Sequence, residues 1–383
     1  MRMLMVAPNI VSFKSFLLEL CETLSLRGVD VHCACSGSEL WGGKGGLQGQ
    51  ELQMHHLELP RGVNPFGHFR SAAALNGLVS SLRPDLVHAH FSAAVFTTAL
   101  ARRSCWPVTI GTFHGLRFPL MTGLGKRVFQ GVEGWSARRL DAVWVLTEDD
   151  RTALVSAAPG AKVHRCTSYG VGCDLARFRR ETLTMEACSR LRLELGLPDN
   201  AMVFAFVGRF VDFKGFDVAV RAFWRLAASY PNARLLLIGD FDRLHPSGLT
   251  REEEERLRAS PMVVHAGWRT DVEKWLAISS ALLAPSSREG MPVSIMEALS
   301  MGVPVLTRDS RGCRDVVRHG VNGLVVDPCS VENLAAAMAE LTVDDALRRR
   351  LSANALENRR DFDRKRYVDE QIAAYEDMLG GSV

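Results

Sequence analysis

Residues 202–230 read MVFAFVGRFVDFKGFDVAVRAFWRLAASY, and the elements that they predict decide the fold. The six apolar residues 202–207 predict a buried strand. A loop with two glycines follows, and residues 216–230 then predict a helix. A buried strand, a short loop and a helix in this order form the repeating unit of parallel α/β sheets.

The same alternation extends outward to both ends of the chain. In the second half, further strands are predicted at residues 234–238, 262–265, 281–284, 303–306 and 324–326, with helices at 271–279 and 293–301. In the first half, strands are predicted at residues 2–7, 29–35, 85–90, 108–112 and 142–146. One helix with a single apolar stripe is predicted from the spacing of Phe13, Phe16, Leu17, Leu20 and Leu24.

Two series of strand–helix units in 383 residues predict an α/β protein of two Rossmann-like domains, each with a parallel sheet. Strand periodicity lapses between residues 169 and 195. We therefore expect one domain over residues 1–180 and a second over residues 181–359. Residues 359–379 are polar and follow helical spacing after the second series has ended.

The composition excludes several classes of protein. With 47% hydrophobic and 23% charged residues, the chain is neither collagen-like nor disordered. No apolar run reaches the roughly 18–20 residues of a membrane span, and residues 3–8 are too few for the core of a signal peptide, so we expect a cytoplasmic protein. The 9 cysteines show no C-x-x-C spacing, which favours reduced thiols over a zinc site or a disulfide framework.

Charge is distributed unevenly along the chain. Residues 1–180 contain 20 Lys and Arg and 13 Asp and Glu, a net charge of +7. Residues 181–383 contain 26 Lys and Arg and 30 Asp and Glu, a net charge of −4, so the whole chain carries +3. This basic first half suits an anionic partner, although small imbalances between domains are also common. Nucleic acid is disfavoured as the partner because the basic residues are dispersed and no recognition motif is present.

One loop in the second half predicts a diphosphate site. The glycine-rich stretch 41–49 looks like a mobile loop and lacks the spacing of dinucleotide and P-loop motifs, which disfavours a dehydrogenase or a P-loop hydrolase. Gly208, Arg209 and Lys214 instead follow the strand 202–207, at the strand end where α/β proteins bind ligands. A glycine there permits close approach of a ligand to the backbone, and the two cations would attract its phosphate groups. The alternative interpretation is that Arg209 and Lys214 are two solvated basic residues on a loop.

A second anion site is predicted at residues 287–298, which read SREGMPVSIMEA. Gly290 and Pro292 form a turn, Pro292 suits a first helical position, and the unpaired amides of the first helical turn would face an anion. Glu289 lies before the helix start and Glu297 about one turn inside it. They could contact opposite ends of one ligand, or be an ordinary helix-start acid and a helix-surface charge.

These residues resemble a known family. Gly208-Arg209 with Lys214-Gly215, the spacing of Glu289 and Glu297, GVPV at 302–305 and GVNGLVVDP at 320–328 are similar to motifs of the retaining GT-B glycosyltransferases of family 4, or glycosyl transferases group 1. In the first half, TFHG at 112–115 and YGVGCDLARF at 169–178 look like the family's front-domain and hinge motifs. The resemblance therefore spans the chain.

The resemblance implies a retaining glycosyltransferase with a nucleotide-sugar donor in the second domain, an acceptor in the first, and catalysis between them. UDP is favoured by family frequency, with GDP as the other option. Neither a metal nor a cofactor is implied, because the nucleotide sugar is a co-substrate. The C-terminal helix, at about residues 360–383, is expected to cross back to the first domain.

The resemblance also implies roles for single residues. Arg209 and Lys214 would neutralise the departing diphosphate, Glu289 would bind hydroxyls of the transferred sugar, and Glu297 would bind the ribose. His114 would approach the reaction centre from the first domain, at the end of the strand 108–112, or would be structural. Donor contacts by the main chain are expected at Gly208, Gly290, Met291, Pro292, Val293 and Ser294.

General chemistry agrees with a metal-independent reaction. Breaking a glycosyl–phosphate bond develops negative charge on the diphosphate, which fixed cations and a helix start can stabilise. Residues 240–242 and 361–363 both read DFD, the letters of a metal-binding motif, but we expect them in surface segments. His88 and His90 share a strand face without an evident third metal ligand.

The sequence defines the acceptor site less closely than the donor site. The loop after the first strand lacks the Gly-Gly pair of many family members, so Ser12 and Lys14 are acceptor-binding candidates by position only. Basic residues interleaved with Phe, Leu and Trp over residues 113–139 indicate either peripheral docking on an anionic membrane surface or an ordinary sheet-covering helix. We expect a saccharide or polyprenyl-linked acceptor in bacterial polysaccharide assembly, on the inner face of the cytoplasmic membrane.

Two other functions stay open. A GT-B-like nucleotide-sugar epimerase would release a changed sugar nucleotide and would not need an acceptor. A non-catalytic nucleotide-sugar-binding subunit is the third alternative. Intact Arg209, Lys214, Glu289 and Glu297 argue against it, because degenerate homologues tend to lose such groups.

Overall fold

The computed structural model describes residues 1–41, 52–60, 62, 64–242 and 244–381, so the glycine-rich stretch predicted to be a mobile loop lies largely outside the described residues. The chain forms two compact units. Unit 1 comprises Met1–Val171 and Lys365–Val383, and unit 2 comprises Gly172–Arg364. Among the described helices, none combines the length and the hydropathy that a bilayer-spanning segment requires.

Unit 1 contains a parallel sheet of seven strands in the order β3-β2-β1-β4-β5-β6-β7. The strands are β1 (Arg2–Asn9), β2 (Asp30–Ser36), β3 (Gln53–His56), β4 (Leu86–His90), β5 (Val108–Phe113), β6 (Ala142–Val145) and β7 (Val163–Arg165). The helices are α1 (Ile10–Phe16), α2 (Leu18–Leu26), α3 (Pro65–Leu82), α4 (Ser92–Ala101), α5 (Gly123–Arg139), α6 (Glu148–Ala157) and α15 (Arg364–Leu379), with short 3-10 turns η1 (Ser38–Trp41) and η2 (Phe118–Leu120).

Unit 2 contains a parallel sheet of six strands in the order β10-β9-β8-β11-β12-β13. The strands are β8 (Met202–Val207), β9 (Ala233–Ile238), β10 (Val263–Gly267), β11 (Ala281–Ala284), β12 (Val305–Arg308) and β13 (Gly323–Val326). The helices are α7 (Met185–Glu194), α8 (Phe216–Ala227), α9 (Arg251–Ala259), α10 (Val272–Ala277), α11 (Val293–Ser300), α12 (Cys313–Val316), α13 (Val331–Val343) and α14 (Asp345–Glu357), with 3-10 turns η3 (Arg180–Thr182), η4 (Asp212–Lys214) and η5 (Arg359–Phe362).

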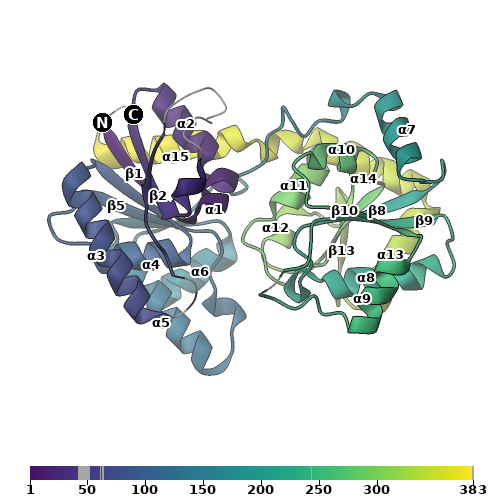
Figure 1. Ribbon diagram of the computed structural model, residues 1–383, viewed down its shortest axis with the longest axis horizontal. Helices are drawn as coiled ribbons and strands as arrows, with labels where there is room; N and C mark the ends of the chain where they lie inside the picture. The colour runs from purple at the N-terminus through teal and green to yellow at the C-terminus, as the bar shows by residue number, and fades with distance from the viewer. Residues whose placement is uncertain (42–51, 61, 63, 243, 382–383) are drawn as a thin grey trace. The chain divides into compact units, whose positions relative to one another are not determined.

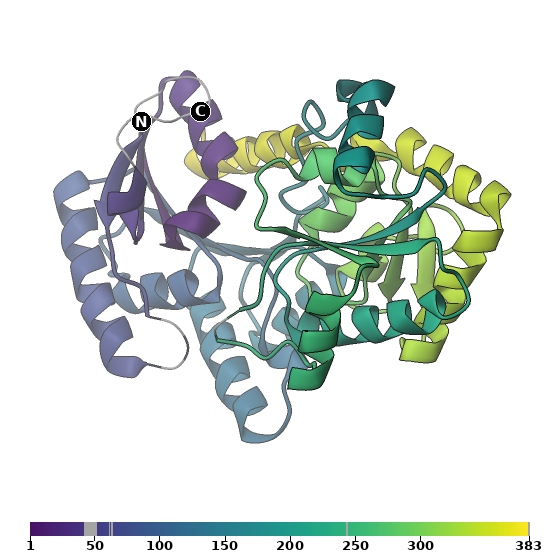
Figure 2. The ribbon, with the colours of Figure 1, turned by 45° about the vertical axis from the view of Figure 1, so that its right-hand side comes forward.

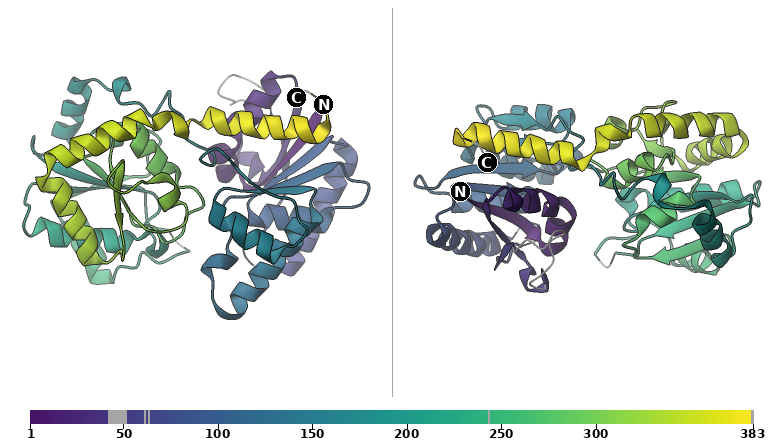
Figure 3. Two further views of the ribbon diagram at one scale, coloured as in Figure 1. Left: turned by 180° about the vertical axis from the view of Figure 1, so that it is seen from behind. Right: turned by 90° about the horizontal axis from the view of Figure 1, so that it is seen from above.

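Helices cover both faces of each sheet (Figures 1 and 2). In unit 1, α3, α4 and α5 lie on one face and α15 lies across the other, as Figure 3 shows from behind. In unit 2, α8 and α13 lie on one face and α10 and α11 on the other (Figure 1). Burial on both faces explains why the strands are continuous apolar runs; Met202 to Phe206, for example, are all buried.

The α/β fold with two Rossmann-like parallel sheets is confirmed. Every predicted strand is present, with ends displaced by at most two residues. Sequence reasoning missed β3 and β7, since both are short edge strands with few buried side chains and therefore show no apolar run.

The prediction of one helix over residues 13–24 was wrong, because the chain forms α1 and α2 with a break at Leu17. The buried stripe continues through this break, since Phe13, Leu17, Leu20 and Leu24 are all buried. Phe16 leaves that stripe, and its ring contacts the ring of His114 edge-on at a centroid distance of 5.5 Å. Helical spacing thus identified the buried side chains but not the interruption.

Candidate active site

The loop predicted to hold a diphosphate and the loop predicted to hold a second anion meet in unit 2. They follow β8 and β11, which are neighbours in the sheet, so both loops leave the same edge. The backbone carbonyl of Phe213 accepts hydrogen bonds from the amide of Ser287 at 2.9 Å and from the hydroxyl of Ser286 at 3.1 Å. A side chain at Gly215 would place its Cβ 2.4 Å from the carbonyl oxygen of Pro285. Glycine is therefore required where the loops touch.

Lys214 and Glu289 form an ion pair between these loops. The Nζ of Lys214 lies 2.5 Å from Oε1 of Glu289, and the two side chains are only 24% and 14% exposed. Such partial burial strengthens the attraction relative to an exposed pair. The structure therefore brings together a cation and a carboxylate that the sequence assigned to separate motifs.

Arg209 has a carboxylate partner of its own, Asp242, at 2.6 Å. Hydrogen bonding by Arg209 holds the pKa of Asp242 below its ordinary value, and the backbone amide of Leu244 also donates to that carboxylate. The expectation that residues 240–242 form a mere surface segment was wrong for Asp242, whose side chain is 13% exposed. The Arg209 side chain, which is itself 47% exposed, covers the Asp242 carboxylate by this ion pair.

The other DFD sequence, at residues 361–363, is also not a free surface segment. Phe362 is 3% exposed, and its carbonyl accepts the amide of Cys173 at 2.8 Å. A main-chain bridge joins Cys173 to Asp363. No cluster of three or more His, Cys, Asp or Glu side chains in the described part of the chain is arranged to hold a metal ion.

A third cation, Arg288, joins the site beside Phe213. The guanidinium carbon of Arg288 lies 4.4 Å from the centre of the Phe213 ring, and that of Arg209 lies 5.5 Å from the same centre. Both distances suit cation–π attraction. Sequence reasoning quoted Arg288 without assigning it a role, because only the fold places it on the same ring as Arg209.

Helix α11 begins at Val293, so the prediction of Pro292 as its first residue was wrong by one position. Pro292 is instead the N-cap and supplies no side-chain hydrogen bond to the first turn. The first-turn amides of Val293 and Ser294 therefore lack side-chain capping. The neighbouring Gly290 is closely packed, since its carbonyl oxygen would lie 2.6 Å from a Cβ at Gly312.

Glu297 lies one turn inside α11 and is partly buried. Burial raises the pKa of its carboxyl from 4.5 to about 7, against the opposing effect of Arg177 and Arg364. Glu297 therefore changes protonation state near neutral pH, unlike an ordinary helix-surface glutamate.

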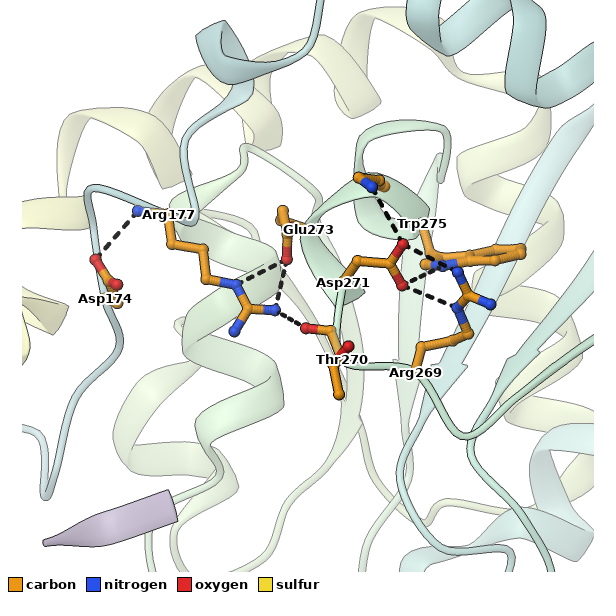
Figure 4. A network of polar contacts seen from close by, with 8 residues as sticks. Asp174, Arg177, Arg269, Thr270, Asp271, Glu273 and Trp275 are labelled. Carbon is orange, nitrogen blue, oxygen red and sulfur yellow. Dashed lines mark hydrogen bonds and ion pairs between the residues drawn. The ribbon is translucent and has the colours of Figure 1, made fainter. Parts of the chain in front are cut away.

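Arg177 and Glu273, whose charges act on Glu297, belong to an ion-pair network, which Figure 4 shows from close by. Arg177 donates from Nε to Glu273 at 2.8 Å and also to the carbonyl of Thr270. Its own amide donates to Asp174 at 3.1 Å, which fixes the segment that resembles the family hinge motif. Asp271 accepts from Arg269 in the same loop at 2.9 Å.

In unit 1, His114 follows β5 and lies among aromatic rings. Its ring stacks on Phe91 at 4.1 Å, and its Nε2 lies 3.2 Å from Nδ1 of His90. Burial lowers the pKa of His114 to about 3, so the imidazole is neutral at physiological pH. The buried carboxylates of Asp150 and Glu133 accept the amides of Leu116 and Arg117 and hold the loop that follows His114.

His88 and His90 lie in the core of unit 1. His88 lies 2.7 Å from the hydroxyl of Tyr375 in α15 and 2.8 Å from that of Thr112. Both histidines are fully buried. These contacts engage both ring nitrogens of His88, whereas His90 contacts Nε2 of His114 through Nδ1 and its own Nε2 has no hydrogen-bond partner among the described residues.

The acceptor candidates lie in α1. The amide of Ser12 donates to Oδ1 of Asn9, which caps the helix at 2.9 Å. Lys14 is exposed, and its Nζ lies 5.3 Å from the centre of the Trp41 ring. Both residues thus lie on the first helix of unit 1.

Family models match most of the chain. Residues 189–358 match the family described as "Glycosyl transferases group 1", and residues 14–167 match the family described as "Glycosyl transferase 4-like domain". The chain is a family 4 glycosyltransferase with the GT-B fold. The match to two family models, one in each unit, agrees with the two parallel sheets.

Individual proteins resemble this glycosyltransferase over most of its length. It is 23% identical to "Putative glycosyltransferase EpsD" of Bacillus subtilis strain 168, covering 96% of this chain and 94% of that protein. It is also 23% identical to the "UDP-Gal:alpha-D-GlcNAc-diphosphoundecaprenol alpha-1,3-galactosyltransferase" of Escherichia coli, covering 76% and 74%. The structure of HepE from Anabaena in complex with UDP superposes with a TM-score of 0.79 at 20% identity, covering 98% and 100%.

The glycosyltransferase thus carries the paired or ring-stacked side chains of Arg209, Lys214, Asp242, Arg288 and Glu289 on the loops after β8, β9 and β11. Sequence reasoning found Arg209, Lys214 and Glu289, and the ion pair joins two of them. Asp242 and Arg288 were missed as members of the site, because their spacing in the sequence does not reveal which side chains they contact. A DFD sequence directly after a predicted strand was the one signal that could have indicated Asp242.

Proposed function

We propose that the enzyme transfers a sugar from a nucleotide sugar, specifically a UDP-sugar, to a saccharide or lipid-linked saccharide, with retention of the anomeric configuration, in bacterial glycan assembly. The observation that carries the proposal is the partly buried Lys214–Glu289 pair at the start of α11. The UDP bound to HepE and the UDP-Gal in the name of the Escherichia coli relative support the choice of nucleotide.

Donor binding would exchange partners within this site. Lys214 would turn from Glu289 to the diphosphate, and Glu289 would then accept hydrogen bonds from hydroxyls of the sugar. Arg209 would add a second positive charge beside the diphosphate. Main-chain amides at Gly290, Met291, Val293 and Ser294, next to Pro292, would contact the sugar and phosphate, and Gly208 would allow close approach.

These groups would act mainly in the transition state. Negative charge grows on the diphosphate as the glycosyl bond breaks, and preorganised cations stabilise that charge without reorganisation. In the proposed front-face mechanism, the departing phosphate oxygen takes the acceptor's proton and no covalent sugar–enzyme bond forms. Glu289 is therefore a sugar-binding group rather than a nucleophile.

The remaining roles follow the same proposal. Glu297, in its ionised form, would accept hydrogen bonds from the ribose hydroxyls. His114, as a neutral imidazole, would contact the sugar through a hydrogen bond rather than act as a strong base. Ser12 and Lys14 would contribute to the acceptor site. The reaction would need neither a metal ion nor a cofactor.

We also propose that the enzyme works as a peripheral protein on an anionic membrane surface facing the cytoplasm. The support is the basic, aromatic segment 113–139 and a relative whose name includes a diphosphoundecaprenol acceptor. A lipid-linked acceptor would be reached most readily from that surface.

A donor screen tests the central proposal. The purified protein is incubated with UDP- and GDP-sugars, first in saturation-transfer NMR for binding and then without acceptor for slow release of nucleotide. We expect one sugar of the UDP series to bind and to release UDP slowly. Release of an altered nucleotide sugar would instead identify an epimerase, and binding without any turnover in the presence of an acceptor panel would favour a non-catalytic subunit.

A further inference from the structure

An apolar pocket lies in unit 1 between α3, α4 and α5. Its volume is about 160 Å³, close to that of engineered apolar cavities that stay dry and take a benzene-sized guest, at about 150 Å³. The wall is formed chiefly by Phe69 of α3, Phe96 and Leu100 of α4, and Val128, Phe129 and Val132 of α5.

The polar side chains at the pocket's edge are already engaged. His68 lies 2.8 Å from the hydroxyl of Thr97, and the carbonyl of Asn64's side chain accepts the amide of Gly67 at 3.0 Å. A guest in this pocket therefore meets carbon on nearly every side. An apolar chain fits such a wall, whereas a peptide would bring backbone polar groups that find no partner there.

Large apolar side chains protrude into solvent around the pocket. In the first two turns of α3, Phe66 is 88% exposed and Phe69 is 62% exposed. On α5, Leu124 is 76% exposed and Val128, one turn later, is 42% exposed. Side chains three or four residues apart share a helix face. The two helices thus present a common apolar rim rather than scattered single residues.

The exposed charged side chains beside these rim residues are mostly basic. Arg117 is exposed, and its guanidinium carbon lies 4.8 Å from the centre of the Phe129 ring in the pocket wall. Glu133 of α5 is 1% exposed and accepts the hydroxyl of Ser92, whereas the exposed Glu58 lines a neighbouring hollow together with Arg70. Exposed Arg70 follows Phe69 directly, and exposed Lys126 and Arg127 lie between Leu124 and Val128.

We propose that this face, residues 64–70 with residues 123–132, docks on an anionic phospholipid bilayer and that its pocket takes the end of one acyl chain. An anionic lipid fits both features of this face. Its negative headgroup would pair with the basic residues, and its hydrocarbon chain would fill the carbon-lined pocket. The inference rests on the proposed membrane association and adds the surface and the lipid group that it binds.

The experiment uses the full-length protein with vesicles of phosphatidylcholine and phosphatidylglycerol in a three-to-one ratio. A fraction of the phosphatidylglycerol carries a photoreactive diazirine at the end of one acyl chain. After sedimentation and irradiation, mass spectrometry locates the labelled peptides. We expect salt-sensitive binding, with label in residues 65–69, 96–100 and 128–132.

Matched variants separate docking from general effects on the protein. Leu124→Asp on α5 is expected to weaken vesicle binding at least about tenfold, because it puts a negative charge on the apolar rim. Leu193→Asp on α7 of unit 2, where the leucine is 81% exposed, is the control and should bind as wild type. Val132→Phe fills the pocket and should reduce the pocket label while vesicle binding at low salt persists. Circular dichroism checks that each variant is folded.

Each contrary result has a distinct meaning. Vesicle binding with label only outside the pocket would overturn the pocket assignment and leave the membrane proposal standing. No binding to anionic vesicles at low salt would overturn both. Equal binding to vesicles of phosphatidylcholine alone, or equal loss in Leu124→Asp and Leu193→Asp, would overturn the proposed surface.

Discussion

Lys214 and Glu289 neutralise one another across two loops, with 2.5 Å between Nζ and Oε1. Lys214→Ala and Glu289→Ala are each expected to lower kcat at least ~100-fold, because a preorganised charge contact to the transition state is lost. Steady-state kinetics with the donor identified by the screen measure this effect.

Lys274→Ala is the matched control, since Lys274 also pairs with a carboxylate of unit 2, Asp271, at 3.3 Å but is 53% exposed. It should retain near-wild-type turnover. If Lys214→Ala and Lys274→Ala behave alike, the assigned role of Lys214 is wrong.

Glu297 predicts a pH dependence of donor binding. Burial raises the pKa of its carboxyl to about 7, and only the ionised form is a full acceptor for two ribose hydroxyls. The donor KM should therefore rise as pH falls below 7. In Glu297→Gln the donor KM should be higher throughout and this pH dependence should vanish. A wild-type KM that is flat from pH 6 to 8, which brackets the cited pKa of about 7, would contradict the ribose role.

The same raised pKa has a consequence for stability. The folded state holds the proton of Glu297 more tightly than the unfolded state, so the stabilisation is present below pH 4.5 and is lost as pH rises through about 7. Glu297→Gln should consequently gain stability relative to wild type between pH 5 and 8, by no more than about 3 kcal/mol. Urea denaturation at several pH values measures the difference, and a constant difference would contradict the shift.

At the scale of elements, the contact between the loops after β8 and β11 depends on Gly215. Its φ of 71° is in the left-handed region, and a Cβ there would lie 2.4 Å from the carbonyl oxygen of Pro285. Gly215→Ala should therefore destabilise unit 2 and also lower turnover, because Lys214 is its neighbour.

Gly196 provides the control for Gly215. Its φ of 61° carries the same backbone strain for alanine, but a Cβ added there would have no neighbouring atom within 4 Å. Gly215→Ala should lower the free energy of unfolding by about 1–3 kcal/mol more than Gly196→Ala, which is the usual cost of forcing an extra methyl group into a packed contact. Equal losses in urea denaturation would show that the loop contact contributes nothing.

Some helices and strands could be located from sequence patterns alone. Apolar runs located β8 and β11 to the residue, because both are covered on two faces. Helical spacing over residues 13–24 gave the buried side chains of α1 and α2 but not their separation at Leu17. Periodicity records which side chains face the core, and it does not record the backbone path between them.

At the scale of the whole molecule, the C-terminal helix completes unit 1. The hydroxyl of Tyr375 lies 2.7 Å from Nδ1 of the fully buried His88, and Glu370 accepts the amide of Ser168 at 2.9 Å. The chain's last helix therefore stabilises the sheet with which the chain begins (Figure 3).

Tyr375→Phe tests this long-range contact. It leaves a buried imidazole nitrogen without its partner, which should cost about 1–3 kcal/mol. Hydrogen exchange of the β4 and β5 amides measures the loss within unit 1. Tyr230→Phe, at a partly buried tyrosine of unit 2, is the control and should leave those amides unchanged. Unchanged protection in Tyr375→Phe would refute a stabilising role for the contact.

The sequence by itself determined the α/β class, the succession of strands, and the identity of Arg209, Lys214, Glu289 and Glu297 as candidates, because burial patterns and short motifs are local properties of the chain. Only the tertiary structure decided which of them meet. It paired Lys214 with Glu289 and Arg209 with Asp242, set Arg288 on the ring of Phe213, and raised the pKa of Glu297 by burial. Contact and burial depend on segments distant in sequence, and no local pattern encodes the distance between two side chains.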